Sequence, residues 1–131
     1  MPPEITALTL AALLHVATLT AMSVSANMLL PRYMTMGKRD KDFVRELTGT
    51  SARLYRTFNN STENLMLFGI AVIIITITQQ SSPVTQASAW VFLAARVAYV
   101  PAYVFGLTPW RSYIWLVGMI ATTTMLIAAL I

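Results

Sequence analysis

Residues 56–64, RTFNNSTEN, lead directly into the apolar run LMLFGIAVIIITI at 65–77. Together they predict one membrane helix that begins with a polar stretch. Arg56, Asn60 and Glu63 follow one another at intervals of four and three residues, so a helix places them within about 60° of one another on one face. Such groups are costly in a membrane unless protein or water satisfies them. The stripe therefore indicates either contacts between helices or a polar ligand site near the membrane surface.

The composition is that of a small membrane protein. The chain has 131 residues, of which 56% are hydrophobic and 11% are charged, with a mean hydropathy of +0.65. Soluble domains carry about 25% charged residues. We expect a single domain over 1–131, with no room for a second. The chain lacks cysteine, which excludes disulfides and thiolate chemistry of its own. The lone histidine, His15, has no second candidate ligand nearby, so we expect no metal site.

Four apolar segments define the predicted fold. Each is long enough for the roughly 20 residues that cross a bilayer as a helix. They lie at about 5–31, 52–80, 84–106 and 110–131, with a polar loop at about 32–51. The expected fold class is therefore an all-α integral membrane protein, a four-helix transmembrane bundle.

The distribution of positive charge predicts the orientation of this bundle. Seven of the nine basic residues lie between Arg32 and Arg56. Loops rich in Lys and Arg remain in the cytoplasm, so this loop is expected there and both termini on the external side. The net charge of +4 is explained by topology, and we expect no nucleic acid as a partner.

A second polar constellation lies in the predicted third helix. Arg96, Tyr99 and Tyr103 are spaced three and four residues apart and share one helical face. Arg96 lies about 15 Å from the cytoplasmic end of its helix, where an arginine needs a partner. Because Glu63 has a comparable depth, we predict a buried Glu63–Arg96 ion pair.

The remaining polar residues gather toward the cytoplasmic half. This group of cations, an amide and phenols comprises Arg53, Arg56, Asn60, Tyr99, Tyr103 and Arg111. Arginine grips carboxylates in bidentate fashion, so the cluster suits a small anionic ligand.

Three motifs resemble one family of membrane proteins. The pattern Arg-x-x-x-Asn-x-x-Glu at 56–63 opens the second of four predicted helices. The run ARVAYVPAY at 95–103 follows in the third, and Arg111-Ser112 begins the fourth. In motif order, span number and length, the chain resembles the membrane-associated proteins in eicosanoid and glutathione metabolism, the MAPEG family, and its short bacterial members in particular.

The resemblance implies a homotrimer with glutathione, as co-substrate, bound between subunits on the cytoplasmic side. The residues that would contact glutathione are Arg53, Arg56, Asn60 and Glu63 from one subunit, with Arg96, Tyr99, Tyr103, Arg111 and Ser112 completing the site, some from the neighbour. Arg32 is an additional candidate. Arg111 would be the catalytic residue that holds the glutathione sulfur as thiolate, since a nearby cation lowers the pKa of a thiol.

The implied function is glutathione-dependent transferase or peroxidase chemistry on a hydrophobic electrophile that arrives through the membrane. Conjugation, peroxide reduction and isomerisation all start from one thiolate, so the reaction stays open. The implied location is a bacterial inner membrane, with lipid around a multi-pass protein. One alternative is a non-catalytic membrane protein that keeps the stripe for assembly. Another is a small multidrug exporter, but the first predicted helix has no acid after Glu4, where that class needs one.

The predicted orientation has a direct test in this cysteine-free chain. Single cysteines at Lys38 and Ile131 are treated with an impermeant thiol reagent on intact cells. We expect labelling at position 131 only, because position 38 lies in the basic loop. Labelling at position 38 without labelling at position 131 would show that the orientation is the reverse of the predicted one.

Overall fold

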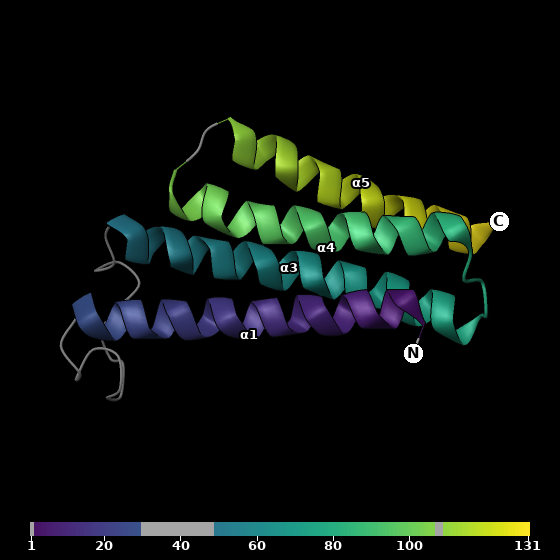
Figure 1. The fold of residues 1–131 in the computed structure, drawn as a ribbon, viewed down its shortest axis with the longest axis horizontal. Helices are drawn as coiled ribbons and strands as arrows, with labels where there is room; N and C mark the ends of the chain where they lie inside the picture. The colour runs from purple at the N-terminus through teal and green to yellow at the C-terminus, as the bar shows by residue number, and fades with distance from the viewer. Residues whose placement is uncertain (1, 30–48, 107–108) are drawn as a thin grey trace.

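The computed structural model describes residues 2–29, 49–106 and 109–131. They form four helices, which are α1 (Pro3–Leu29), α3 (Gly49–Ile77), α4 (Pro83–Val104) and α5 (Trp110–Leu130), and no strand occurs among these residues. The predicted all-α, four-helix architecture is confirmed. Figure 1 shows the helices side by side, with the start of α1 and the end of α5 at one end of the bundle and the end of α4 and the start of α5 at the other.

The helix boundaries follow from local chemistry. Helix α3 begins at Gly49, three residues before the predicted start, and ends three residues before the predicted end. The start of α4 is fixed by a capping box, in which the Ser82 hydroxyl accepts from the Thr85 N–H at 3.3 Å and the Thr85 hydroxyl accepts from the Ser82 N–H at 2.8 Å. Pro83 follows as the first helical residue, where its missing N–H costs nothing. Most of the predicted loop at 32–51 lies outside the described residues.

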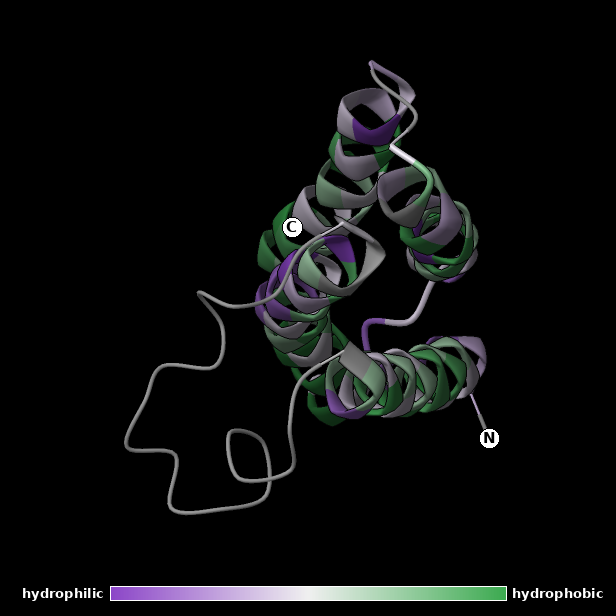
Figure 2. Ribbon diagram, turned by 90° about the vertical axis from the view of Figure 1, so that its left-hand side faces the viewer, coloured by the Kyte–Doolittle hydropathy of each residue, from purple (hydrophilic) through white to green (hydrophobic). Residues whose placement is uncertain are grey.

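The four helices form one bundle when viewed almost along their axes (Figure 2). Helix α5 packs mainly on α4 and α1 mainly on α3, while α1 also contacts α4. The stacked rings of Phe68 and Phe92 lie in the core, with centroids 4.0 Å apart and at most 1% of either residue exposed. Val72, Ile75 and Met125 belong to the same buried cluster.

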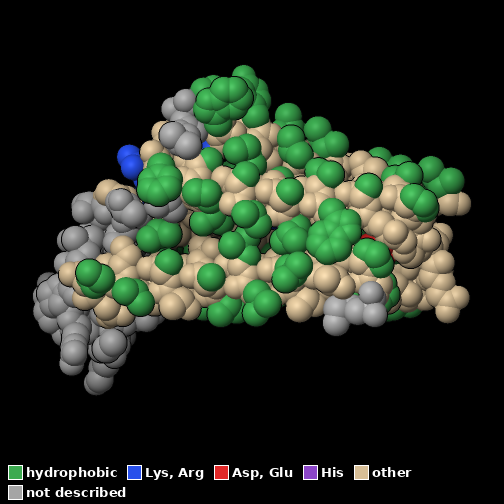
Figure 3. Space-filling view, in the orientation of Figure 1, with side chains coloured by type: hydrophobic (Ala, Val, Ile, Leu, Met, Phe, Trp, Pro, Cys, Tyr) green, Lys and Arg blue, Asp and Glu red, His purple; other side chains and the backbone are tan. Residues whose placement is uncertain are grey.

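The outer faces of the helices are apolar. Large hydrophobic side chains such as Ile73, Val97 and Ile120 are exposed along the bundle. Figure 3 shows hydrophobic groups over the length of one face, and the basic side chains of the described residues in this view lie at the end that holds the α4–α5 turn. A soluble monomer rarely exposes apolar surface on this scale. Among the described residues, three helical segments are long and apolar enough to cross a membrane, namely Pro3–Met28, Ala52–Ile77 and Trp110–Leu130.

Helix α4 is not among these three segments, and it carries polar residues on its inner side. Its polar residues Thr85, Ser88 and Arg96 are buried in the bundle. Its outer face carries residues such as Val91 and Val97. The polar groups of α4 therefore lie inside the protein, where partners can satisfy them.

One of these inward contacts secures the end of the bundle that holds both termini. Glu4 is only 1% exposed, and the Ser81 hydroxyl lies 2.9 and 3.0 Å from its two carboxylate oxygens. Thr85 adds a longer hydrogen bond of 3.5 Å. The buried carboxylate thus ties the start of α1 to the turn between α3 and α4.

Candidate functional site

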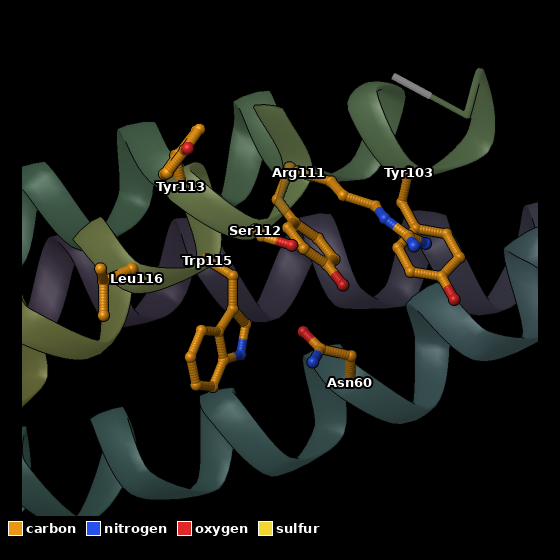
Figure 4. Close-up of a pocket in the computed structure, with 8 residues that line it drawn as sticks. Asn60, Tyr103, Arg111, Ser112, Tyr113, Trp115 and Leu116 are labelled. Atoms are coloured by element: carbon orange, nitrogen blue, oxygen red, sulfur yellow. The ribbon is translucent and has the colours of Figure 1, made fainter. Parts of the chain in front are cut away.

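A cavity of about 560 Å³ opens between α3, α4 and α5 near the α4–α5 turn (Figure 4). Its walls combine a cation, an amide, a hydroxyl and aromatic rings. The lining residues are Asn60, Tyr99, Tyr103, Arg111, Ser112, Tyr113, Trp115 and Leu116. This volume lies within the range of about 300–1,000 Å³ that is typical of small-molecule sites.

Two arginines from different helices flank Tyr103 at the polar end of the cavity. Arg56 Nε, on α3, donates to the Tyr103 hydroxyl at 2.9 Å. The Arg111 guanidinium, in the first turn of α5, lies 4.8 Å from the centroid of the same ring. Figure 4 shows the Arg111 side chain reaching toward Tyr103. The electron-rich ring attracts both cations, so two positive charges are held beside the cavity.

Arg96 organises the adjacent interior. Its Nη1 donates to Asn60 Oδ1 at 3.0 Å and its Nη2 donates to Ser61 Oγ at 2.6 Å. Its guanidinium also lies 4.3 Å from the centroid of the Tyr99 ring. Although Arg96 is only 5% exposed, these contacts satisfy part of its hydrogen-bonding capacity. They also join α4 to α3 beneath the cavity.

The hydrogen bonds to Asn60 fix which way its amide points. Asn64 Nδ2 donates to Asn60 Oδ1 at 2.9 Å, in addition to the bond from Arg96. Both neighbours are donors, so the oxygen of Asn60 must face them. The amide NH₂ of Asn60 then remains as the group that this residue can offer to a ligand. Asn60 therefore serves the cavity as a donor, which suits an anionic or carbonyl-bearing molecule.

The predicted Glu63–Arg96 ion pair is not formed. Arg96 bonds Asn60 and Ser61 instead, Glu63 is exposed, and no ion pair joins Glu63 to Arg96. The reason is angular. At 100° per residue, Glu63 points about 110° away from the direction midway between Asn60 and Ser61, which is the side of α3 that faces Arg96. Glu63 and Arg96 lie at similar depths along their helices, but Glu63 does not point toward α4.

The other predicted site residues differ in where the structure places them. Asn60, Tyr99, Tyr103, Arg111 and Ser112 line the cavity, and Arg56 and Arg96 contact its lining residues. The Arg53 guanidinium lies against Gly106, close to the position that a Cβ would occupy at 3.4 Å. Gly106 also has a φ of +69° in the turn before α5, so glycine suits both demands. Glu63 is exposed on the outer side of α3, and Arg32 lies outside the described residues.

Several residues of the site were not predicted. Ser61 and Asn64 hold Arg96 and Asn60, while Tyr113, Trp115 and Leu116 form much of the cavity wall. Trp115 and Leu116 lie four residues, about one turn, beyond Arg111 and Ser112, so helical spacing was a usable signal for them. Ser61 carried no such signal because it lies off the Arg56-Asn60-Glu63 stripe.

These features define an integral membrane protein whose helical bundle holds a pocket of cations and aromatic rings near one end. The model of the MAPEG family matches residues 5–131, and the chain belongs to this family. No curated protein and no solved structure was found to match the chain.

The observed partners of Arg96 predict a specific pattern of coupling. We expect Arg96→Leu and Asn60→Ala to be non-additive in the free energy of unfolding by about 1–2 kcal/mol, because they share one partly buried hydrogen bond. Equilibrium unfolding in mixed micelles with increasing sodium dodecyl sulfate measures this. As the control, Arg96→Leu and Glu63→Gln should be additive. Coupling to Glu63 in place of Asn60 would contradict the observed contacts.

Proposed function

We propose that this protein binds glutathione in the described pocket and uses its thiolate for transferase or peroxidase chemistry on a hydrophobic electrophile. Membership of the MAPEG family is consistent with glutathione-related chemistry of this kind. The observation that carries the proposal is that Arg56 and Arg111 both contact Tyr103, which lines the cavity.

The charges around the cavity match the groups of the tripeptide. Glutathione has two carboxylates, which pair with guanidinium groups such as those of Arg56 and Arg111. The NH₂ of Asn60 is oriented to donate to a carboxylate or peptide oxygen. The carboxylate of Glu63, which is exposed on the outer side of α3, would suit the ammonium group of glutathione bound between subunits. Arg53, Tyr99, Tyr103 and Ser112 complete the proposed binding set.

Arg111 is the proposed catalytic residue because its charge would stabilise the thiolate of bound glutathione. It lies in the first turn of α5, where the positive end of the helix dipole adds to its effect. A nearby cation lowers the pKa of a thiol, and the thiolate is the reactive species. In conjugation, its sulfur forms a bond to an electrophilic carbon as a leaving group departs. In peroxide reduction, it attacks a hydroperoxide oxygen, the O–O bond breaks, the departing alkoxide takes a proton, and a second glutathione converts the sulfenic acid to disulfide and water.

The apolar wall of the cavity is the proposed site of the second substrate. Trp115 and Leu116 extend the cavity along α5 away from Arg111 (Figure 4). Both are exposed on the outer surface of the subunit, so a hydrophobic molecule dissolved in lipid can reach them. The glutathione thiolate at Arg111 would meet this hydrophobic molecule at the polar end of the cavity.

A homotrimer in a bacterial inner membrane is part of this proposal. Exposed Glu63 lies four turns into α3 and directly before its apolar run. A carboxylate at such a position is costly if it faces lipid, so a neighbouring subunit or the ligand is the expected partner. We propose that all four helices cross the membrane, with the pocket end on the cytoplasmic side and both termini outside.

The thiolate role of Arg111 predicts a change in titration. In Arg111→Ala, we expect the pKa of the bound glutathione thiol to rise by at least one unit, the equivalent of about 1.4 kcal/mol. Tripeptide affinity should fall by less than about tenfold, because the other cations remain. Ultraviolet absorbance of the thiolate across pH, measured beside binding affinity, tests both expectations.

Arg111→Lys provides the matched control, since it retains a positive charge in the first turn of α5. It should keep most of the shift in the thiol titration. An Arg111→Ala variant with intact binding and an unchanged thiol titration would exclude the catalytic role and leave Arg111 as an interfacial anchor.

A further inference from the structure

His15 of α1 packs against α3 and presents one nitrogen to the interior. Its ring stacks on Phe58 with centroids 4.8 Å apart and planes 3° from parallel. Its Nε2 lies 3.1 Å from the Thr62 hydroxyl. Its Nδ1 is buried and receives no hydrogen bond from any described group, unlike the other buried side-chain nitrogen and oxygen atoms of the described residues. A polar atom in this position calls for a partner.

A small cavity lies beside this histidine. Its volume is about 10 Å³, which is about the space that one water molecule needs. Its polar lining comes from His15, Ser61 and Arg96, and the rest of the lining is Ala11, Leu14, Leu65 and Phe92. Two of the three polar residues are those whose hydrogen bond ties α3 to α4 at the floor of the larger pocket.

The hydrogen bonds of Thr62 indicate where the proton of His15 lies. The Thr62 hydroxyl donates its single hydrogen to the Phe58 carbonyl oxygen at 2.9 Å. A hydroxyl that donates there accepts from His15, whose Nε2 then carries the proton. A second positive charge beside buried Arg96 would be costly, so we take the imidazole as neutral. Nδ1 is then a hydrogen-bond acceptor.

The opposite wall of the small cavity supplies donors. Ser61 Oγ accepts from Arg96 Nη2 at 2.6 Å, which leaves the hydrogen of Ser61 to be donated. Arg96 has only N–H donors. A water molecule between them can donate to His15 Nδ1 and accept from Ser61 or Arg96, so every group has a complementary partner.

We propose that this small cavity is a site for one structural water, and that His15 acts through it as a positioning residue for the Ser61–Arg96–Asn60 arm. The water links α1 to the guanidinium that holds the oxygen of Asn60 and so directs its NH₂ into the larger pocket. Only the last step, an effect on glutathione, rests on the proposed function.

The tautomer of His15 tests the first part without any ligand. Because the chain has a single histidine, ¹⁵N-histidine labelling gives one pair of ring signals in a nuclear magnetic resonance spectrum at neutral pH. We expect a protonated Nε2 and an unprotonated, hydrogen-bonded Nδ1. Thr62→Val should reduce the preference for this tautomer. A wild-type spectrum with Nδ1 protonated, alone or together with Nε2, would overturn the proposal.

Two amide substitutions test the link to the pocket. The oxygen of Asn can occupy the position of Nδ1, whereas the amide end of Gln reaches the position of Nε2. We expect His15→Gln to raise the glutathione Kd about tenfold, and His15→Asn to keep it within about threefold of wild type. Equal effects of the two variants, or the reverse order, would overturn the positioning role. If wild-type protein binds no glutathione, the proposed function fails, and the tautomer alone decides the proposal for His15.

Discussion

The buried guanidinium of Arg96 is the constraint on which the rest of the structure depends. An arginine inside a membrane bundle is tolerated only where polar groups surround it, and here those groups come from α3 and α4. Asn60 and Ser61 accept its hydrogen bonds, and the Tyr99 ring lies 4.3 Å from its Cζ atom. No carboxylate takes part in these contacts. The two helices are therefore held in a fixed register at the level where the pocket begins.

This arrangement places polar groups inside the bundle and leaves the outer faces to the lipid. Arg96 with its partners occupies the half of the bundle near the α4–α5 turn, while Glu4 with Ser81 and Thr85 occupies the opposite end. Between them, Phe68 and Phe92 stack in an apolar core. The distribution explains how α4 can carry Arg96 and other polar residues and still expose an apolar surface. It also leaves one half of the bundle free to build a pocket that is rich in cations.

The sequence predicted helices and their polar faces well, because both depend on local spacing. Apolar runs separated by polar turns gave four helices, and the 56–63 and 96–103 spacings led to residues that meet at one cavity. Local spacing could not predict which residues of the 56–63 and 96–103 segments contact one another. Depth along a helix follows from counting residues, but the side that faces a neighbour depends on how the helices pack. The sequence therefore predicted Glu63 as the partner of Arg96, whereas the actual partners are Asn60 and Ser61. The tautomer of His15 likewise depends on Thr62 of another helix.

The central claim is that the arginines of this pocket bind glutathione and hold its sulfur as thiolate. Calorimetric titration of the purified protein in detergent at neutral pH, in buffers of different ionisation enthalpy, tests it most directly. Glutathione is compared with an analogue in which a methyl group replaces the thiol. The account predicts saturable binding of both peptides, with proton release for glutathione alone. No saturable binding of either peptide, or equal proton release for both, would contradict it.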